Sequence, residues 1–222
     1  MCGRFTLTVD PAELQEAFKD YTFPAKYAPR FNVAPTQPVL AIPNDGLNRA
    51  DFFTWGLIPS WSKEASIGYR LINARGETLG EKPSFRGVYK YKRCLILADG
   101  FYEWKSQPGS KTKIPQFIHL KTGKPFAFAG LWDEWQSPDG SEIRSCTIVT
   151  TAPNTLMAAI HDRMPVILDP ADYGEWIDKA VREPESLNHL IKAFPAELMQ
   201  AYPISTLVNS PANDRPELIV PA

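Results

Sequence analysis

The residue with the clearest potential for covalent chemistry is Cys2, which follows Met1. An initiator methionine is generally removed when the next side chain is small, and its removal would leave an α-amine and a thiol on one residue. Their ordinary pKa values are about 8 and about 8.5, so free amine and thiolate coexist near neutral pH. The amine can condense with an aldehyde to an imine, and the neighbouring thiolate can then close a thiazolidine ring intramolecularly. Cys2 is therefore predicted to capture an aldehyde, although a cysteine at a frayed N-terminus can also have no role.

Four other polar residues could assist such a reaction. Glu103 lies between aromatic residues and, on a strand, would share a face with Phe101 and could relay protons. His161 is one of three histidines in the chain. Asn73 and Arg75 are two residues apart and would share a strand face, where Asn73 could orient a hydroxyl or carbonyl and Arg75 could hold a phosphate. For each of them, an ordinary structural or solvent-exposed role is an open alternative.

The composition limits the partners and cofactors. The chain has 24 basic and 25 acidic residues, so any site for a polyanion must be a local cluster of arginines. Three cysteines without a Cys-x-x-Cys pair argue against a disulfide framework and a structural zinc site, and Cys94 and Cys146 are expected to be buried small hydrophobes. Neither zinc-like spacing nor a glycine-rich phosphate loop occurs. We therefore expect no metal and no other cofactor.

The sequence predicts a protein of a reducing, aqueous compartment. The acidic residues Asp10, Glu13 and Glu16 near the start of the chain do not suit a signal peptide, and the longest apolar runs are far short of the roughly 18 residues that span a bilayer. We expect a cytoplasmic or nucleoid-associated protein without membrane contact. No feature of the sequence indicates more than a monomer.

A β-rich framework must position these residues. Residues 11–19 suit a short helix with Asp10 as its cap and Pro11 at its first position. Further helices are predicted at 170–181, 184–194 and 196–202. Because strands outnumber long helices and do not alternate with them, we predict one α+β domain over residues 1–222, with a mostly antiparallel, barrel-like sheet core and peripheral helices. The predicted strands, separated by turn-forming residues, are 39–42, 52–57, 94–98, 116–120, 126–131 and 143–150.

Six short motifs occur in order along nearly the whole chain. They are Met1-Cys2-Gly3-Arg4-Phe5, Asn32-Val33-Ala34-Pro35, Trp55-Gly56, Ile72-Asn73-Ala74-Arg75 with Glu77, Asp99-Gly100-Phe101-Tyr102-Glu103-Trp104, and His161-Asp162-Arg163-Met164-Pro165. Each alone is a weak signal. Together they resemble the SRAP (SOS response-associated peptidase) family, whose members act on abasic sites in single-stranded DNA.

This resemblance implies a substrate for Cys2. A ring-opened abasic deoxyribose is an aldehyde, and its capture would give a thiazolidine DNA–protein cross-link that shields the lesion from strand cleavage. By resemblance, Asn73 positions the substrate or the amine, Glu103 moves protons during ring opening and condensation, and His161 assists proton transfer around the imine. The imine is also an electron sink, so a lyase-type β-elimination is an expected side activity.

Contacts with single-stranded DNA are expected from cations on phosphates and from aromatic rings on bases. For Trp55 and Trp61, core packing is the alternative. The residues Lys90, Lys92 and Arg93 could extend a basic groove, but a solvated charge run is the favoured interpretation. The predicted phosphate contacts are Arg4, Arg75 and Arg163, and the predicted stacking or wedge residues are Trp55, Trp61 and Trp104, with Pro35 from the second motif.

Two other functions stay open at this level. In an N-terminal-nucleophile hydrolase or thiol peptidase, Cys2 would be the nucleophile, its own amine the base, and Asn73 part of an oxyanion hole. In a noncatalytic module that binds single-stranded or damaged DNA, Cys2 would be incidental. A covalent product with abasic DNA distinguishes the three.

Overall fold

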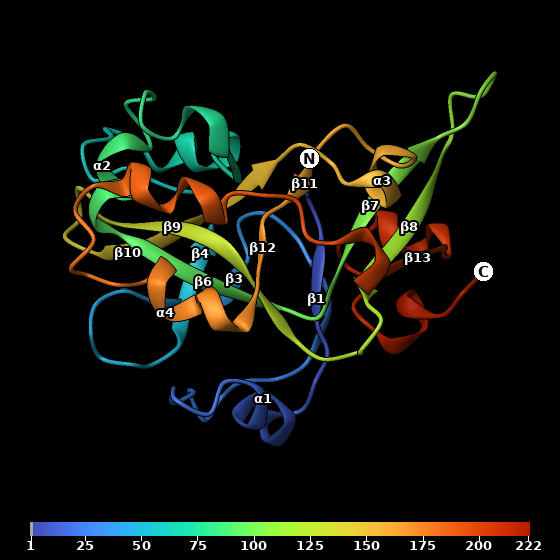
Figure 1. Cartoon of the computed structure of the whole chain (residues 1–222), viewed down its shortest axis with the longest axis horizontal. Helices are drawn as coiled ribbons and strands as arrows, with labels where there is room; N and C mark the ends of the chain where they lie inside the picture. Colours follow the sequence, from blue (N-terminus) through green and yellow to red (C-terminus); the bar gives the residue numbers. More distant parts are fainter. Residues whose placement is uncertain (1) are drawn as a thin grey trace.

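The larger of the two sheets in the computed structural model, which describes residues 2–222, contains a closed five-stranded barrel (Figure 1). Within the ring, β10 pairs with β4, β4 with β3, β3 with β6, β6 with β9, and β9 again with β10. The β10–β4 pairing is parallel and the other four are antiparallel. The ring strands are β3 (Pro38–Pro43), β4 (Asp51–Trp55), β6 (Arg93–Ala98), β9 (Phe126–Gln136) and β10 (Glu142–Thr151). Three short strands extend it: β5 (Asn73–Arg75) and β11 (Met164–Pro165) along β10, and β12 (Ile167–Leu168) along β9.

A second sheet of five antiparallel strands packs beside the barrel, in the order β13-β8-β7-β1-β2. Its strands are β1 (Phe5–Leu7), β2 (Arg30–Val33), β7 (Gly100–Ser106), β8 (Lys113–Leu120) and β13 (Met199–Pro203). The outer halves of β7 and β8 project from the body as a hairpin, at the upper right of Figure 1. The predicted α+β class with a mostly antiparallel, barrel-like core is confirmed, and each of the six predicted strands is present.

The helices are short and peripheral. The α-helices are α1 (Pro11–Ala17), α2 (Arg86–Tyr91), α3 (Thr155–Ala158) and α4 (Tyr173–Trp176). Short 3-10 helices occur at Ala65–Arg70, Gly76–Thr78, Pro170–Asp172, Pro184–Leu190, Ala196–Leu198, Thr206–Asn209 and Pro216–Ile219. In α1 the predicted cap is confirmed, since the Asp10 carboxylate accepts from the backbone of Ala12 and Glu13 while the Glu13 carboxylate accepts from the Asp10 N–H. Across residues 2–222, no helix combines the length and apolarity that a membrane crossing requires.

Alternate residues of the barrel strands divide between two cores. On β6, Leu95 and Leu97 pack in one buried cluster with residues of α2 and α4, which lie outside the barrel. Cys94 and Ile96 pack in another cluster with Ile148, on the inner side, as the alternation of strand side chains requires. Cys94 and Cys146 are both fully buried in this inner cluster, which confirms that they serve as small hydrophobes.

All three helix predictions at the C-terminal side, at 170–181, 184–194 and 196–202, are wrong in part. Residues 196–202 form one 3-10 turn and then strand β13, because Met199–Pro203 pairs antiparallel with β8 and this tertiary pairing outweighs local helix propensity. The helix predicted at 170–181 ends at Trp176, and residues 184–190 form 3-10 rather than α-helix. The early end of α4 has a visible cause, because the carbonyls of Trp176 and Asp178 accept hydrogen bonds from a buried arginine.

That arginine is Arg93. From the sequence, we expected it to belong to a solvent-exposed run of charges with Lys90 and Lys92. It is instead fully buried at the start of β6. Its guanidinium donates to main-chain carbonyls of Tyr89 and Trp176 at 2.9 and 2.6 Å, and to those of Lys90, Asp178 and Val181. The side chain thus fastens the end of α2 and the segment after α4 to the barrel, which satisfies carbonyls that a helix end leaves open.

Replacing Arg93 should therefore cost more stability than replacing a solvent-exposed arginine of α2. Arg93→Ala leaves several buried carbonyls without donors, and we expect the free energy of unfolding to fall by about 3 kcal/mol or more. Denaturant titration followed by circular dichroism measures this. Arg86→Ala, on the exposed side of α2, is the matched control and should change the value by less than about 0.5 kcal/mol. Equal losses for the two variants would contradict the structural role of Arg93.

Candidate functional site

Cys2 lies directly ahead of β1 and is completely buried, with 0% of its surface exposed. It packs in the inner barrel cluster with Phe5 and Phe101. The Cys2 thiol points its Sγ at the carbonyl oxygen of Arg4, 3.8 Å away. Burial raises the pKa of the Cys2 thiol well above its ordinary value, and the negative charge of Glu103 raises it further. The thiol is thus held in its protonated form at neutral pH.

Asn73 is the side chain that contacts Cys2 directly. It stands on β5, which pairs in parallel with β10 so that Asn73 lies opposite Ile148. Its Nδ2 donates to the carbonyl oxygen of Cys2 at 2.8 Å. Its Oδ1 is buried and, among the described residues, accepts no hydrogen bond. Since buried polar atoms are normally satisfied, this oxygen is an acceptor held ready beside the Cys2 backbone.

Glu103 reaches the same site from the second sheet. It is only 3% exposed, and it lies on the face of β7 that also carries Phe101, whose partner on β1 is Phe5. Tyr102, on the opposite face, packs in a different cluster with Val208 and Leu218. The strand alternation expected for residues 101–104 is therefore present, and it aims Glu103 toward the barrel and Cys2 rather than toward the C-terminal segment.

His161 follows α3, and its neighbours Ile160 and Met164 pack in the cluster that contains Cys2. Its Nδ1 lies 3.1 Å from the backbone nitrogen of Arg163 and 2.8 Å from Asp162 Oδ1. These two contacts exclude each other, because Nδ1 accepts from an N–H only when unprotonated and donates to a carboxylate only when protonated. The Asp162 side chain is 87% exposed, so water screens its attraction, and the Arg163 contact is the one expected in the neutral ring.

The predicted phosphate contacts differ in their electrostatic surroundings. Arg4 donates to Asn32 Oδ1 at 2.9 Å and to the carbonyls of Val208 and Asn209 at 2.7 and 3.1 Å, all of which are neutral acceptors. Partial burial lowers the pKa of Arg4, but a guanidinium stays charged near neutral pH. These bonds hold Arg4 in place without cancelling its positive charge. Arg75, at the end of β5, is exposed.

Arg163 is arranged differently. Its two terminal nitrogens donate to the two carboxylate oxygens of Glu77 at 2.6 and 2.9 Å, and Nη2 also donates to the carbonyl of Thr150 at 2.7 Å. This bidentate hydrogen bond lowers the pKa of the Glu77 carboxyl. The charge of Arg163 is therefore largely balanced within the protein, and a phosphate would have to compete with Glu77 for it.

The predicted aromatic contacts separate into buried and exposed residues. Trp55 is completely buried, its ring packs edge-on against Phe5 at 5.0 Å, and its Nε1 donates to the Ile72 carbonyl. A base-stacking role for Trp55 is therefore wrong. Trp61 is 60% exposed and borders a cavity of about 380 Å³. Trp104 is half-buried with Nε1 bonded to Asn209 Oδ1, and Pro35 is half-buried in the loop after β2.

The glycine of the Trp55-Gly56 motif also has a structural explanation. Gly56 has a φ of +130°, and an added Cβ would lie 2.6 Å from the carbonyl oxygen of Gly68. No other residue fits that close approach. The third motif therefore shapes the barrel wall next to the site and supplies no side chain for the reaction.

Sequence reasoning gave no role to Asn32, which organises the C-terminal loop around the site. Asn32 is fully buried, and its Nδ2 donates to the carbonyls of Val208, Ser210 and Asn213 while its Oδ1 accepts from Arg4. The available signal was that Asn32 stands among the apolar residues Phe31, Val33 and Ala34. The carbonyls that accept from its Nδ2, however, lie 176 to 181 positions away along the chain, and spacing alone does not reveal them.

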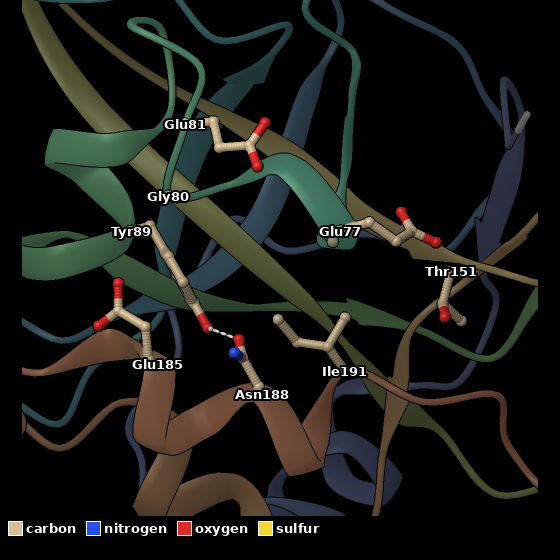
Figure 2. A pocket seen from close by; sticks show the side chains of 9 residues that line it. Glu77, Gly80, Glu81, Tyr89, Thr151, Glu185, Asn188 and Ile191 are labelled. Carbon is tan, nitrogen blue, oxygen red and sulfur yellow. Dashed lines mark hydrogen bonds between the residues drawn. The ribbon is translucent and has the colours of Figure 1, made fainter.

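A cavity of about 420 Å³ lies on the other side of Glu77 (Figure 2). Glu77, Glu81 and Glu185 contribute carboxylates to its walls, and the Tyr89 hydroxyl donates to Asn188 across it. Of the described residues, those that line it do not include Cys2, Asn73 or Glu103. The cavity is therefore separate from the Cys2 site, and Glu77 forms the wall between the cavity and Arg163.

The family model for SOS response associated peptidase (SRAP) matches residues 1–211 of the chain. The chain belongs to the SRAP family. Cys2, Asn73, Glu103 and His161 all lie within the matched range.

Known relatives agree with the SRAP assignment. The chain is 51% identical over 222 residues to the abasic site processing protein YoqW of Bacillus subtilis (strain 168), with 99% of both chains covered. It is 33% identical over 265 residues to the abasic site processing protein HMCES of Gallus gallus, covering 100% of this chain and 78% of that protein. A crystal structure of a protein from Bacteroides thetaiotaomicron superimposes with a TM-score of 0.89 at 27% identity, with both chains covered in full.

The hydrogen bonds predict different tautomers for the histidines of this SRAP protein. Neutral His161 should carry its proton on Nε2, because Nδ1 accepts from Arg163 N–H. His119 and His189 should carry it on Nδ1, since this nitrogen lies 2.9 and 2.8 Å from the carbonyl oxygens of Leu120 and Ser186. Ring ¹⁵N chemical shifts, recorded at a pH where the histidines are neutral, distinguish the two forms. A His161 signal that matches the other two would contradict the arrangement described.

Proposed function

We propose that this protein captures abasic sites in single-stranded DNA through Cys2, once Met1 has been removed, and forms a thiazolidine DNA–protein cross-link. The observation that carries the proposal is the convergence on Cys2 of Asn73 from the barrel and Glu103 from the second sheet. Further support comes from the printed names of the relatives, which are abasic site processing proteins. The aldehyde of a ring-opened abasic deoxyribose is the electrophile that an aminothiol is suited to trap.

The reaction balances as a condensation. The Cys2 α-amine adds to C1′ of the open sugar, and the resulting carbinolamine loses water to give an imine. The sulfur then adds to the same carbon, a C–S bond forms, and the nitrogen takes up a proton. The net change joins one aldehyde and one aminothiol and releases one water. Ring closure is intramolecular and needs no further reactant.

Glu103 is the group placed to accept the thiol proton. A buried thiol beside a carboxylate resists ionisation, because two negative charges would then lie close together in an apolar setting. The thiol becomes nucleophilic when Glu103 takes up its proton. The same carboxylic acid can return the proton to the sugar ring oxygen or to sulfur, which makes the link reversible at the same site.

The remaining residues have supporting roles in the proposal. Asn73 fixes the Cys2 carbonyl through Nδ2 and offers Oδ1 to the new amine or to a sugar hydroxyl. His161, with its proton on Nε2, acts as acid or base around the imine. Arg4 and Arg75 bind phosphates, Arg163 binds one in exchange for Glu77, and Trp61, Trp104 and Pro35 contact bases. A lyase-type elimination from the imine accompanies capture.

A thiol peptidase that uses the same cysteine receives less support from the site. A peptidase cysteine works as a thiolate, which needs a depressed pKa and a positive neighbour. Here burial and Glu103 both raise the pKa of the Cys2 thiol. Condensation through the amine begins without a thiolate, so the aldehyde reaction fits this environment better than peptide hydrolysis.

Abasic single-stranded oligonucleotide incubated with the purified protein should give a heat-stable shifted band on a denaturing gel. Cys2→Ala should lose at least about 99% of this product, because the ring needs sulfur. Cys2→Ser keeps the amine and should give a band only after borohydride reduction of the imine. A variant that keeps one residue ahead of Cys2 should give neither product. Intact-mass measurement establishes which residue is N-terminal in each preparation.

Cys146→Ala is the matched control, since Cys146 is a buried cysteine of the same core cluster. It should cross-link at the wild-type rate if it is folded. A band that persists in Cys2→Ala would overturn the proposal. Reversible binding without any band would favour a noncatalytic binding module, and peptide hydrolysis without a band would favour the hydrolase.

Glu103→Gln should shift the pH dependence of Cys2 alkylation. Because the carboxylate charge raises the pKa of the Cys2 thiol, its removal lowers that pKa, and alkylation by iodoacetamide should begin at a lower pH than in the wild type. Mass spectrometry of the Cys2 peptide measures the extent of alkylation at each pH. Cross-link formation should nevertheless slow by about 10²-fold or more, because the proton acceptor is gone. A variant with an unchanged alkylation profile and unchanged cross-linking rate would remove Glu103 from both roles.

A further inference from the structure

The β7–β8 hairpin carries a concentration of positive charge that the Cys2 site does not use. Lys105, Lys111 and Lys113 lie in its outer part, and all three are exposed. The chain contains no aspartate or glutamate from residue 104 through residue 132. These lysines are therefore without acidic neighbours along the hairpin, although the whole protein has a net charge of −1.

The hairpin is a protruding two-stranded ribbon. β1 pairs with β7 at Gly100 and Phe101, and β13 pairs with β8 from Gln116 to Leu120. Outward of Trp104 and Pro115, within residues 2–222, β7 and β8 pair only with each other. The tip is a turn closed by the bond from Ser110 N to Gln107 O, with Pro108 and Gly109 at its centre and a φ of +75° at Gly109, which is typical of a type II turn. Figure 1 shows this arm extending clear of the barrel.

The arm begins at the site itself. Lys105 is two residues beyond Glu103 on β7, so it stands on the same face of the strand, about 7 Å further out. Lys113 pairs with Ser106 and projects from the other face, and Lys111 lies in the turn region. A polyanion that reaches Cys2 past Glu103 therefore meets Lys105 first and can follow the arm outward.

We propose that the outer hairpin, Lys105 to Lys113, is an arm that binds the phosphate backbone of single-stranded DNA on one side of the abasic site. The inference rests on the proposed function, because it takes DNA at Cys2 as its starting point. The ammonium groups of the lysines bind successive phosphates, and these contacts hold the strand without reading its sequence. The arm adds to the local cluster of Arg4 and Arg75 a second contact region along the strand.

A different explanation for the lysines is edge protection. Charged residues on a protruding ribbon discourage pairing with another chain, and lysine is common in that position. The two explanations make opposite predictions. Edge protection predicts aggregation when the lysines are lost and unchanged DNA affinity of the monomer, whereas a DNA arm predicts weaker binding by a monomeric protein.

The test is the salt dependence of binding to an undamaged, thymidine-only single-stranded oligonucleotide, which cannot form the covalent link. The arm variant is Lys105→Gln, Lys111→Gln and Lys113→Gln combined. The control variant changes Lys19, Lys121 and Lys124 to Gln, which are equally exposed and remove the same charge at the α1 end of the molecule. Each lost phosphate contact reduces the slope of log K against log salt by about 0.7, so the arm variant should lose about 2 from its slope. The control variant should keep the wild-type slope.

Equal slopes for the arm variant and the wild type would overturn the proposal. So would an equal loss in the two variants, which would mean a general charge effect, and so would aggregation with unchanged affinity of the monomer. Cross-linking to abasic DNA, measured on the same preparations, reports on the proposed function separately. A selective slope loss without any cross-link would keep the arm and reject capture by Cys2, and a cross-link with unchanged slopes would do the reverse.

Discussion

The hydrogen bond from Asn73 to the Cys2 carbonyl is the contact on which the arrangement of the site depends. It joins β5, a strand fastened to the barrel through β10, to the segment that leads into the second sheet. Arg4 is anchored by other hydrogen bonds, from the Tyr102 N–H to its carbonyl and from its guanidinium to Asn32, but the bond from Asn73 is the one that fixes the Cys2 carbonyl. With it, the backbone of Cys2 has a defined position, and the thiol and the α-nitrogen are placed relative to Glu103. Cys2 lies near the start of the sequence, but it is buried in the fold.

Burial determines how that residue can react. A thiol in an apolar cluster beside a carboxylate is a poor thiolate, so the site is not built for direct attack by sulfur. It suits the proposed reaction, in which sulfur enters last and its proton moves to a neighbour. The raised pKa of the Cys2 thiol therefore favours the proposed condensation over acyl transfer. A thiol hydrolase would use the same types of residue, but it would need a thiolate.

Three arginines of the chain show how much a side chain's role depends on its partners. Arg93 is buried and donates to carbonyls that end two helical segments, so its role is structural. Arg163 is balanced by Glu77, and Arg4 is held by neutral acceptors that leave its charge in effect. Only the last arrangement offers a fixed and uncompensated cation beside Cys2. The sequence distinguishes none of these cases, because all the partners are distant along the chain.

Local signals were sufficient for much of the framework. The Asp10 cap, the six apolar runs that became strands, and the alternation that sets Glu103 apart from Tyr102 all depend on residues within a few positions of one another. Prediction was less successful where a distant segment decided the outcome. Residues 199–203 became a strand because β8 offered them a pairing edge, and Trp55 was buried because Phe5 and the Ile72 carbonyl covered it. A tryptophan in a motif looks the same in sequence whether it faces solvent or the core.

The sequence by itself pointed to the chemistry of the proposed function, because removal of Met1 would leave an amine and a thiol together on Cys2. It also determined the order of the motifs and the period of the strands, which are local properties. Only the tertiary structure decided which groups surround that cysteine, which arginine is paired with a carboxylate, and that the lysines beyond Glu103 stand on a projecting arm. These outcomes depend on contacts between residues far apart in the chain. Such contacts form only when the packing of the whole domain compensates for the entropy lost in bringing them together.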